Sequence, residues 1–208
     1  DSSQQSLNAA GETFHVKALY TDIEEMLLAE ELDVVLVLVP TDGQSVMALT
    51  AARHKCHVLT EIPYAITLSI GDAVAEACSE NGVKWEVAEN VWLWPHEQLK
   101  RKIVEAELLG KITHARLWYT SGSYHGFNAI RMILRREAKG VLGYAQLVEA
   151  PSYISYGGTR EENSWWENGI IEFEGGVVCL YEKPPWPGVQ KSHWEIEGAK
   201  GYLTGNGR

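Results

Sequence analysis

The sequence predicts an α/β first half, a doubly wound parallel sheet, followed by an α+β part with an open, mostly antiparallel sheet. Up to about residue 92, short apolar runs rich in β-branched residues alternate with amphipathic helical segments, which is typical of βαβ units. After that point, strand-like segments follow one another and are separated by glycine-rich turns. Because 208 residues suffice for two small domains, we expect one over residues 1–92 and a second over residues 93–208.

The start of the first half holds one short strand, one helix and one strong strand. His15 to Leu19 is predicted as a short strand. Asp22 precedes apolar residues at helical spacing, and Glu25 follows three residues later, a typical capping pattern for the start of a helix. The run 34–39 is continuously apolar and Pro40 ends it, so we expect a central parallel strand with both faces buried.

The remaining elements of the first half complete the alternation. We expect helices over 45–54 and 68–81, the second ended by Gly82, and strands over 57–60 and 83–88. Ligands of such sheets bind where the carboxyl ends of parallel strands meet. The residues at those ends are Pro40, Thr41, Asp42, Glu61, Ile62, Pro63, Glu89 and Asn90.

The second half opens with helices and closes with strands. Glu174-Gly175-Gly176 predicts a tight turn, so the apolar segments 169–173 and 177–181 on either side of it are expected to form a hairpin. The other expected elements are helices over 95–108 and 126–136 and strands over 111–120, 194–197 and 202–204.

Composition excludes several classes of protein. Apolar residues make up 45% and charged residues 22% of the chain, which excludes a disordered chain. The net charge of −10 argues against nucleic acid or an anionic membrane surface as the main partner. No apolar stretch is long enough to cross a bilayer, and no signal peptide is visible. Three sparse cysteines do not suggest a disulfide framework, so we expect a cytoplasmic protein.

The stretch from Asp33 to Arg116 resembles the Gfo/Idh/MocA family, which contains glucose–fructose oxidoreductase, inositol dehydrogenase and their relatives. The resemblance rests on the order of short motifs. A strand ending in Pro40-Thr41 is followed by the segment 57–63, His-Val-Leu-Thr-Glu-Ile-Pro, where the family has a Lys-His-Val strand ending in Glu-Lys-Pro. Trp94-Pro95 then matches the family's linker helix, and the segment 194–201 resembles its Gly-Thr-Lys-Gly turn.

This resemblance implies a partial Rossmann-type domain that binds NAD or NADP. It also implies a C-terminal domain whose sheet holds the substrate and forms a homo-oligomer. The implied reaction transfers a hydride to or from a secondary alcohol of a sugar, cyclitol or similar small molecule, and it needs a proton acceptor near the reacting hydroxyl. On this basis His125 is the candidate catalytic residue, and Asn128 and Trp94 are candidates for substrate binding. The expected cofactor contacts are Pro40, Thr41, Glu61, Ile62 and Asn90.

The sequence departs from the family in three places. No Gly-x-Gly-x-x-Gly precedes the first strands, so we expect that the sequence is a fragment or lacks part of the cofactor cradle, and that the C-terminal domain is truncated as well. The family's catalytic lysine is replaced by Ile62, which cannot carry a proton, and its aspartate by Ser121. Whether the protein is an active enzyme is therefore open. The alternatives are a catalytically impaired homologue that binds a ligand or supports assembly, and a purely structural oligomerisation module.

His125 precedes the expected helix 126–136, and the partial positive charge of a helix N-terminus favours a neutral imidazole that can accept a proton. Asn128 lies three residues later, near the same face. A lone histidine can equally be structural, and Trp94 can equally belong to a core or an oligomer contact.

Two other patterns carry less weight. His54, Cys56 and His57 could suggest a metal site, but their side chains should diverge and no second ligand pair follows, so we expect no metal. Ser121 and His125 are too close in sequence to favour a serine nucleophile and its base.

Overall fold

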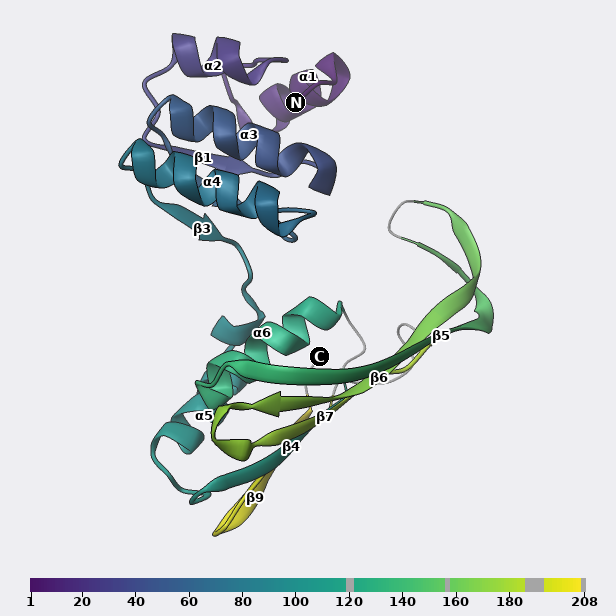
Figure 1. Cartoon of the computed structure of the whole chain (residues 1–208). Helices are drawn as coiled ribbons and strands as arrows, with labels where there is room; N and C mark the ends of the chain where they lie inside the picture. Colours follow the sequence, from purple (N-terminus) through teal and green to yellow (C-terminus); the bar gives the residue numbers. More distant parts are fainter. Residues whose placement is uncertain (119–121, 156–157, 186–192, 207–208) are drawn as a thin grey trace. The chain divides into compact units, whose positions relative to one another are not determined.

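The computed structural model describes residues 1–118, 122–155, 158–185 and 193–206, and it divides the chain into two compact units, Asp1–Glu89 and Asn90–Arg208 (Figure 1). In the first unit three parallel strands alternate with helices, in the order β1-β2-β3. Val35 pairs with Val58, and Val58 pairs with Trp85. The elements are α1 (Gln4–Phe14), α2 (Ile23–Ala29), β1 (Val34–Val37), α3 (Thr41–Arg53), β2 (His57–Thr60), α4 (Leu68–Glu80) and β3 (Trp85–Val87).

Strand β1 does not have two buried faces, so that prediction is wrong. Val35 and Val37 are buried against the helices, whereas Val34 and Leu36 are 46% and 58% exposed. The alternation arises because the core of this unit lies on one side of the sheet, where β1 and β2 pack against small residues of α3 and α4. Among the described residues β1 has one strand neighbour, β2.

The ends of several elements differ from the predictions. His15 to Leu19 is not a strand: His15 caps α1 in the left-handed conformation, with φ of 58°, and irregular chain follows it. Helix α1 was not predicted, although the side chain of Ser3 caps it by accepting a hydrogen bond from the Ser6 amide. Helix α3 begins at Thr41 rather than at residue 45. The predicted cap of α2 is confirmed, because the Asp22 carboxylate accepts hydrogen bonds from the amides of Glu24 and Glu25.

The second unit is built on a six-stranded sheet in the order β5-β6-β7-β4-β8-β9. Strand β4 runs parallel to β7, and the other neighbours are antiparallel. The predicted hairpin is confirmed, since η2 (Glu174–Gly176) joins β6 and β7. The other elements are η1 (Val91–Leu93), α5 (Pro95–Glu105), β4 (Ile112–Trp118), α6 (Ser123–Leu134), β5 (Ala138–Ile154), β6 (Arg160–Phe173), β7 (Val178–Lys183), β8 (His193–Gly198) and β9 (Gly201–Asn206).

Helices α5 and α6 lie on one face of this sheet, and the core is on that side (Figure 1). Ile130 of α6 is fully buried there together with Leu117, Phe173 and Trp194 of the strands. The other face of the sheet carries a mixture of apolar and charged side chains, described below.

Strands β5 and β6 form a ribbon that continues beyond the rest of the sheet. They pair from Ala138–Phe173 as far as Ile154–Arg160, whereas β7 pairs with β6 only over residues 167–172. Strand β5, which begins at Ala138 directly after α6, is not among the strands predicted one by one from the sequence.

Candidate functional site

The carboxyl ends of β1 and β2 bring four of the predicted cofactor contacts to one edge of the parallel sheet. Pro40 is the N-cap of α3 and Thr41 is its first residue. Glu61 and Ile62 follow β2, and the Glu61 carboxylate accepts a hydrogen bond of 2.9 Å from the Ile62 amide. The fifth predicted contact, Asn90, is exposed and is the first residue of the other unit.

A cavity of about 450 Å³ lies along β1 in the first unit. Its wall is mostly apolar and includes Leu36, Leu38 and Val39. Asp1 and Asp22 contribute carboxylates, and its described lining includes neither lysine nor arginine. Such a lining suits a ring system and hydroxyl groups better than phosphate groups, which favour cationic partners.

In the second unit, α6 positions the predicted catalytic histidine. The helix begins at Ser123, three residues before the predicted start at Gly126, so His125 lies within the first turn and does not precede it. Asn128 lies three residues after His125 and is its neighbour on the helix surface; both side chains are half-buried. The Tyr124 ring lies 4.5 Å from the His125 ring, between centroids.

Trp94 is the N-cap of α5 and packs, half-buried, against the core of the second unit. Its ring lies 5.7 Å from the His96 ring. A core contact is therefore established for Trp94, while its predicted contact with substrate stays a prediction. Ser121 lies outside the described residues.

A polar cluster that the sequence did not predict lies where α6 meets β6 and β7. The Ser123 hydroxyl donates a hydrogen bond of 2.7 Å to the Glu167 carboxylate and accepts one of 2.6 Å from the Tyr181 hydroxyl. The other Glu167 oxygen accepts a hydrogen bond of 2.8 Å from the Lys183 ammonium group. These four side chains, Ser123, Glu167, Tyr181 and Lys183, are called the Glu167 cluster below.

The ionisation of the Glu167 cluster follows from its contacts. Burial opposes the charge of Glu167, but hydrogen bonds from Lys183 and Ser123 and the Lys183 charge outweigh it and lower its pKa. Burial raises the pKa of Tyr181 to about 12, although its bond to Ser123 acts in the opposite direction. The four side chains are thus joined in one hydrogen-bond network, in which Tyr181 donates to Ser123 and both Ser123 and Lys183 donate to Glu167.

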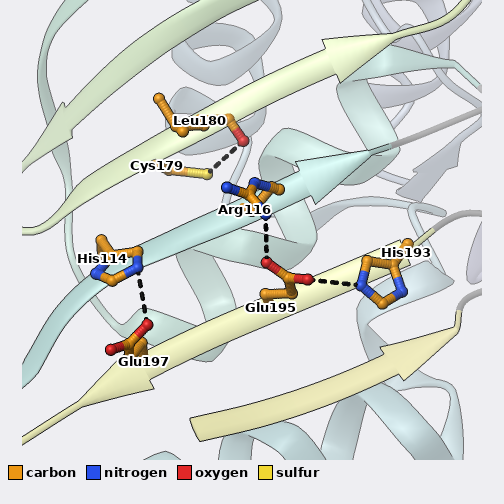
Figure 2. A network of polar contacts seen from close by, with 7 residues as sticks. All are labelled: His114, Arg116, Cys179, Leu180, His193, Glu195 and Glu197. Carbon is orange, nitrogen blue, oxygen red and sulfur yellow. Dashed lines mark hydrogen bonds and ion pairs between the residues drawn. The ribbon is translucent and has the colours of Figure 1, made fainter.

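A second network lies on the face of the sheet opposite α5 and α6 (Figure 2). Arg116 of β4 and His193 of β8 lie 2.8 Å and 3.1 Å from the two carboxylate oxygens of Glu195. His114 lies 3.0 Å from Glu197, and both side chains are about half exposed. The His193 hydrogen bond, together with the Arg116 charge, lowers the pKa of Glu195 against the opposing effect of burial.

A cavity of about 630 Å³ on this face has a largely apolar lining that includes Leu142, Tyr144, Trp166, Ile170 and Leu180.

The cysteine and histidine of the weak metal pattern have other contacts. The Cys56 thiol contacts the Leu32 carbonyl at 3.2 Å, and His57 Nδ1 accepts a hydrogen bond of 3.0 Å from the Lys84 amide. Within residues 1–118, 122–155, 158–185 and 193–206, no three His, Cys, Asp or Glu side chains form a group that could hold a metal ion. The helices of that part of the chain also include none with the length and apolar character of a membrane span.

Comparisons with known proteins agree with the predicted resemblance. Residues 1–89 match the model of the Gfo/Idh/MocA oxidoreductase family, described as an NAD-binding Rossmann fold, and the resemblance predicted from the sequence is thereby confirmed. The D-apiose dehydrogenase of Paraburkholderia graminis is 33% identical over 90 residues, which are 43% of this chain and 24% of that protein. The chain thus spans about a quarter of the length of this curated relative.

Solved structures match over nearly the whole chain. A probable dehydrogenase from Thermotoga maritima superposes with a TM-score of 0.84 at 19% identity, over 99% of this chain and 67% of that one. The myo-inositol 2-dehydrogenase of Lactobacillus plantarum gives a TM-score of 0.77 at 17% identity, over 98% of this chain and 66% of that one. An Agrobacterium radiobacter oxidoreductase in complex with NAD⁺, L-tartaric acid and magnesium gives a TM-score of 0.83 at 16% identity, over 98% of this chain and 64% of that one. These matches confirm the predicted fold class.

Proposed function

We propose that the chain belongs to an NAD(P)-dependent oxidoreductase that transfers a hydride to or from a secondary alcohol of a sugar, cyclitol or similar small molecule. The match of residues 1–89 to an NAD-binding oxidoreductase family carries this proposal. The parallel sheet of the same residues supports it, because its carboxyl edge brings Pro40, Thr41, Glu61 and Ile62 together.

The chemistry of the first unit fits part of a dinucleotide. The apolar wall along β1 suits a nucleotide ring, and the Thr41 hydroxyl and the Glu61 carboxylate can bond ribose hydroxyls. The carboxylates of the cavity disfavour phosphates at that point. When bound, the cofactor supplies the hydride acceptor or donor, while Pro40, Thr41, Glu61, Ile62 and Asn90 hold it.

In the second unit, His125 is proposed to accept the proton of the reacting hydroxyl. Its position in the first turn of α6, three residues before Asn128, supports this, because the two side chains are neighbours on the helix surface. Asn128 is proposed to bind a neighbouring hydroxyl, and Trp94 to contact the apolar face of the substrate.

Ile62 is the observation that favours the second candidate, a homologue that binds ligand without transferring hydride. It stands where the family's proton-carrying lysine is found, and a branched alkyl side chain cannot exchange a proton. If the lysine is the one group that the site lacks for hydride transfer, Ile62→Lys should raise the rate of NAD-dependent oxidation of the best polyol substrate. A wild-type rate that is already ordinary for a polyol dehydrogenase would refute the idea that Ile62 impairs catalysis.

The test of the main proposal is a titration with NADH and with NADPH, read by energy transfer from tryptophan to the nicotinamide after the intact mass is verified. Micromolar binding of either nucleotide, followed by turnover in a screen of sugars and cyclitols, is the expected result. Absence of binding by a chain of verified mass 23.2 kDa would contradict the proposal for this chain.

We further propose a homo-oligomer formed through the open face of the six-stranded sheet. Leu142 is 71% exposed, Tyr144 56% and Leu180 41%, and paired charges lie beside this apolar area. The expected result in light scattering is a mass that is a multiple of 23.2 kDa.

We also propose that the protein is located in the cytoplasm. Cys56, Cys78 and Cys179 are free, buried thiols, and free thiols are typical of a reducing compartment.

A further inference from the structure

A cavity of about 530 Å³ lies in the second unit, where the last turns of α5 and α6 meet the turn between β8 and β9. Its walls carry more cationic than anionic side chains, although the chain as a whole has a net charge of −10. We propose that this cationic cavity binds the phosphate group of a small phosphorylated metabolite, a phosphate monoester. The charged residues of its described lining are Lys111, Arg135, Arg136, Lys200, Glu105 and Glu107.

The charge balance of the lining indicates a ligand with about two negative charges. Its four cationic and two anionic side chains leave an excess of two positive charges. Glu105 already contacts both Arg101, at 2.9 Å, and Arg135, at 3.3 Å. A phosphate monoester carries about −1.5 to −2 charges at pH 7 and three acceptor oxygens, whereas a carboxylate carries one charge and two oxygens. The monoester therefore matches the excess better than a carboxylate does.

Backbone hydrogen bonds bring the two lysines of the cavity together. The Ala199 amide donates to the Lys111 carbonyl at 3.0 Å, and the Lys200 amide donates to the Leu109 carbonyl at 2.9 Å. The Lys200 side chain lies over Gly110, since a Cβ there would be 2.9 Å from Lys200 Cγ. Among the described residues neither lysine takes part in an ion pair, so both ammonium groups can donate to a ligand.

Arg136 is held in place by the turn between β6 and β7. Its Nη1 donates a hydrogen bond of 2.7 Å to the carbonyl oxygen of Glu174. The guanidinium group lies where a Cβ of residue 175 would be, and Gly175 leaves that room. Because the partner in this contact is a carbonyl oxygen and not a carboxylate, the contact does not neutralise the charge of Arg136. The remaining N–H groups of the guanidinium can donate to phosphate oxygens.

A structural role at the end of a helix accounts for only two of the four cations. Arg135 and Arg136 follow the last turn of α6, where cations compensate the partial negative charge of a helix C-terminus. Lys111 precedes β4 and Lys200 joins β8 to β9, so neither directly follows a helix. The two lysines therefore point to a ligand rather than to helix stabilisation.

The cationic cavity lies at the opposite end of α6 from the proposed catalytic histidine. His125 is in the first turn of the helix and Arg135 follows the last one. At 1.5 Å per residue, the two positions are about 15 Å apart along the helix. The phosphorylated ligand would thus act as an effector and not as the substrate, and this inference does not depend on the proposed function.

Two variants test the site, each with a matched change of charge outside the cavity. Lys200→Gln removes a cation and should weaken binding of a phosphate monoester about 5-fold, the upper range for an exposed ion pair. Glu107→Gln removes a repelling carboxylate and should strengthen binding by up to about the same factor. The controls Lys102→Gln and Glu149→Gln change exposed residues outside the described lining and should leave binding unchanged.

The measurement is an amide NMR titration of the whole chain with glycerol 3-phosphate, with glycerol and with L-malate. It is done in about 0.15 M NaCl, where exposed charges interact over only about 8 Å, so that unspecific attraction is suppressed. The expected result is a saturable shift of the Gly110 and Ala199 amides by glycerol 3-phosphate and not by glycerol. This binding should be weaker in Lys200→Gln, stronger in Glu107→Gln and unchanged in both controls.

Several outcomes would overturn the site: no saturable shift, an equally strong response to L-malate, or the same affinity in Lys200→Gln and Lys102→Gln. A parallel titration with inorganic phosphate distinguishes two sources of the same group. Tighter binding of the ester supports a phosphorylated metabolite, whereas equal binding overturns the metabolite and leaves a site for free phosphate. None of these results depends on NADH or NADPH, so failure of this site and failure of the proposed function are distinguishable.

Discussion

The buried ion pair of α5 gives the sharpest prediction about stability. Lys100 is 4% exposed and Glu97 is 1% exposed, and the ammonium nitrogen lies 2.8 Å from one carboxylate oxygen. The same nitrogen lies 4.6 Å from the centre of the Trp194 ring. The perturbation is Lys100→Met, which keeps the length of the side chain and removes its charge.

The loss leaves the Glu97 carboxylate inside the core with little compensation. One of its oxygens accepts no hydrogen bond from any described group, and the other keeps only His96, at 3.2 Å. Removing one partner of such a pair costs about 3–5 kcal/mol. The carboxyl group can recover part of this loss by taking up a proton, so the cost should be smaller at acidic pH.

The assay is urea denaturation of the whole chain at neutral pH, followed by tryptophan fluorescence. The matched control is Arg101→Met on the same helix, whose partner Glu105 lies 2.9 Å away in a partly exposed pair, and it should cost at most about 1 kcal/mol. The double variant Lys100→Met/Glu97→Leu should be close to wild type in stability, because no unpaired charge remains. A cost of Lys100→Met no larger than that of Arg101→Met would refute the reasoning.

Three further predictions concern a cap, a close approach and a titration. Asp22→Ala should lower stability by about 1 kcal/mol and speed hydrogen exchange of the α2 amides, because it removes the cap; unchanged exchange would contradict this. Gly198→Ala should cost about 1–3 kcal/mol in the same denaturation assay, since its Cβ would overlap the carbonyl oxygen of Leu109 in the turn between α5 and β4; a neutral effect would show that this turn can move away from β8 freely. His193→Ala should raise the pKa of Glu195 toward 4.5 in a carboxyl NMR titration. Because the pKa of Glu195 is lower in the folded than in the unfolded state, its charge stabilises the fold at pH values above the unfolded-state pKa, and this stabilisation is lost as pH falls through the folded-state pKa. The variant should therefore lose less stability on acidification than the wild type. An unchanged Glu195 pKa in the variant would show that Arg116 alone lowers it.

Features set by neighbouring residues were predictable from the sequence. The turn at Glu174-Gly175-Gly176 and the Asp22 cap depend on residues within a few positions, and both are found as expected. Strand β2 and the parallel order of the first sheet followed from the spacing of apolar runs. Which face of β1 is buried could not be predicted. Every residue from Val34 to Val39 is apolar, so the run has no alternation of apolar and polar residues that would distinguish a buried face from an exposed one.

The Glu167 cluster could not be predicted for a different reason. Ser123 and Glu167 are 44 residues apart, and Tyr181 and Ser123 are 58 residues apart. Their contacts depend on the register of β6 against β7 and on α6 beginning at Ser123, and no local pattern encodes either. The sequence placed His125 and Asn128 on one helix correctly, but their roles stay predictions.

The position of β4 in its sheet has a consequence for how the protein folds during synthesis. This strand leaves the ribosome before all other strands of its sheet, yet its two neighbours are β7 and β8, and the contact from Arg116 to Glu195 spans 79 residues. The β5-β6-β7 meander can form from local contacts alone. Both edges of β4, in contrast, stay unpaired until β7 and β8 have been synthesised. Closure of such long loops slows folding, and unpaired edges invite aggregation. The second unit should therefore depend on chaperones more strongly than the first, whose neighbouring strands follow one another in sequence.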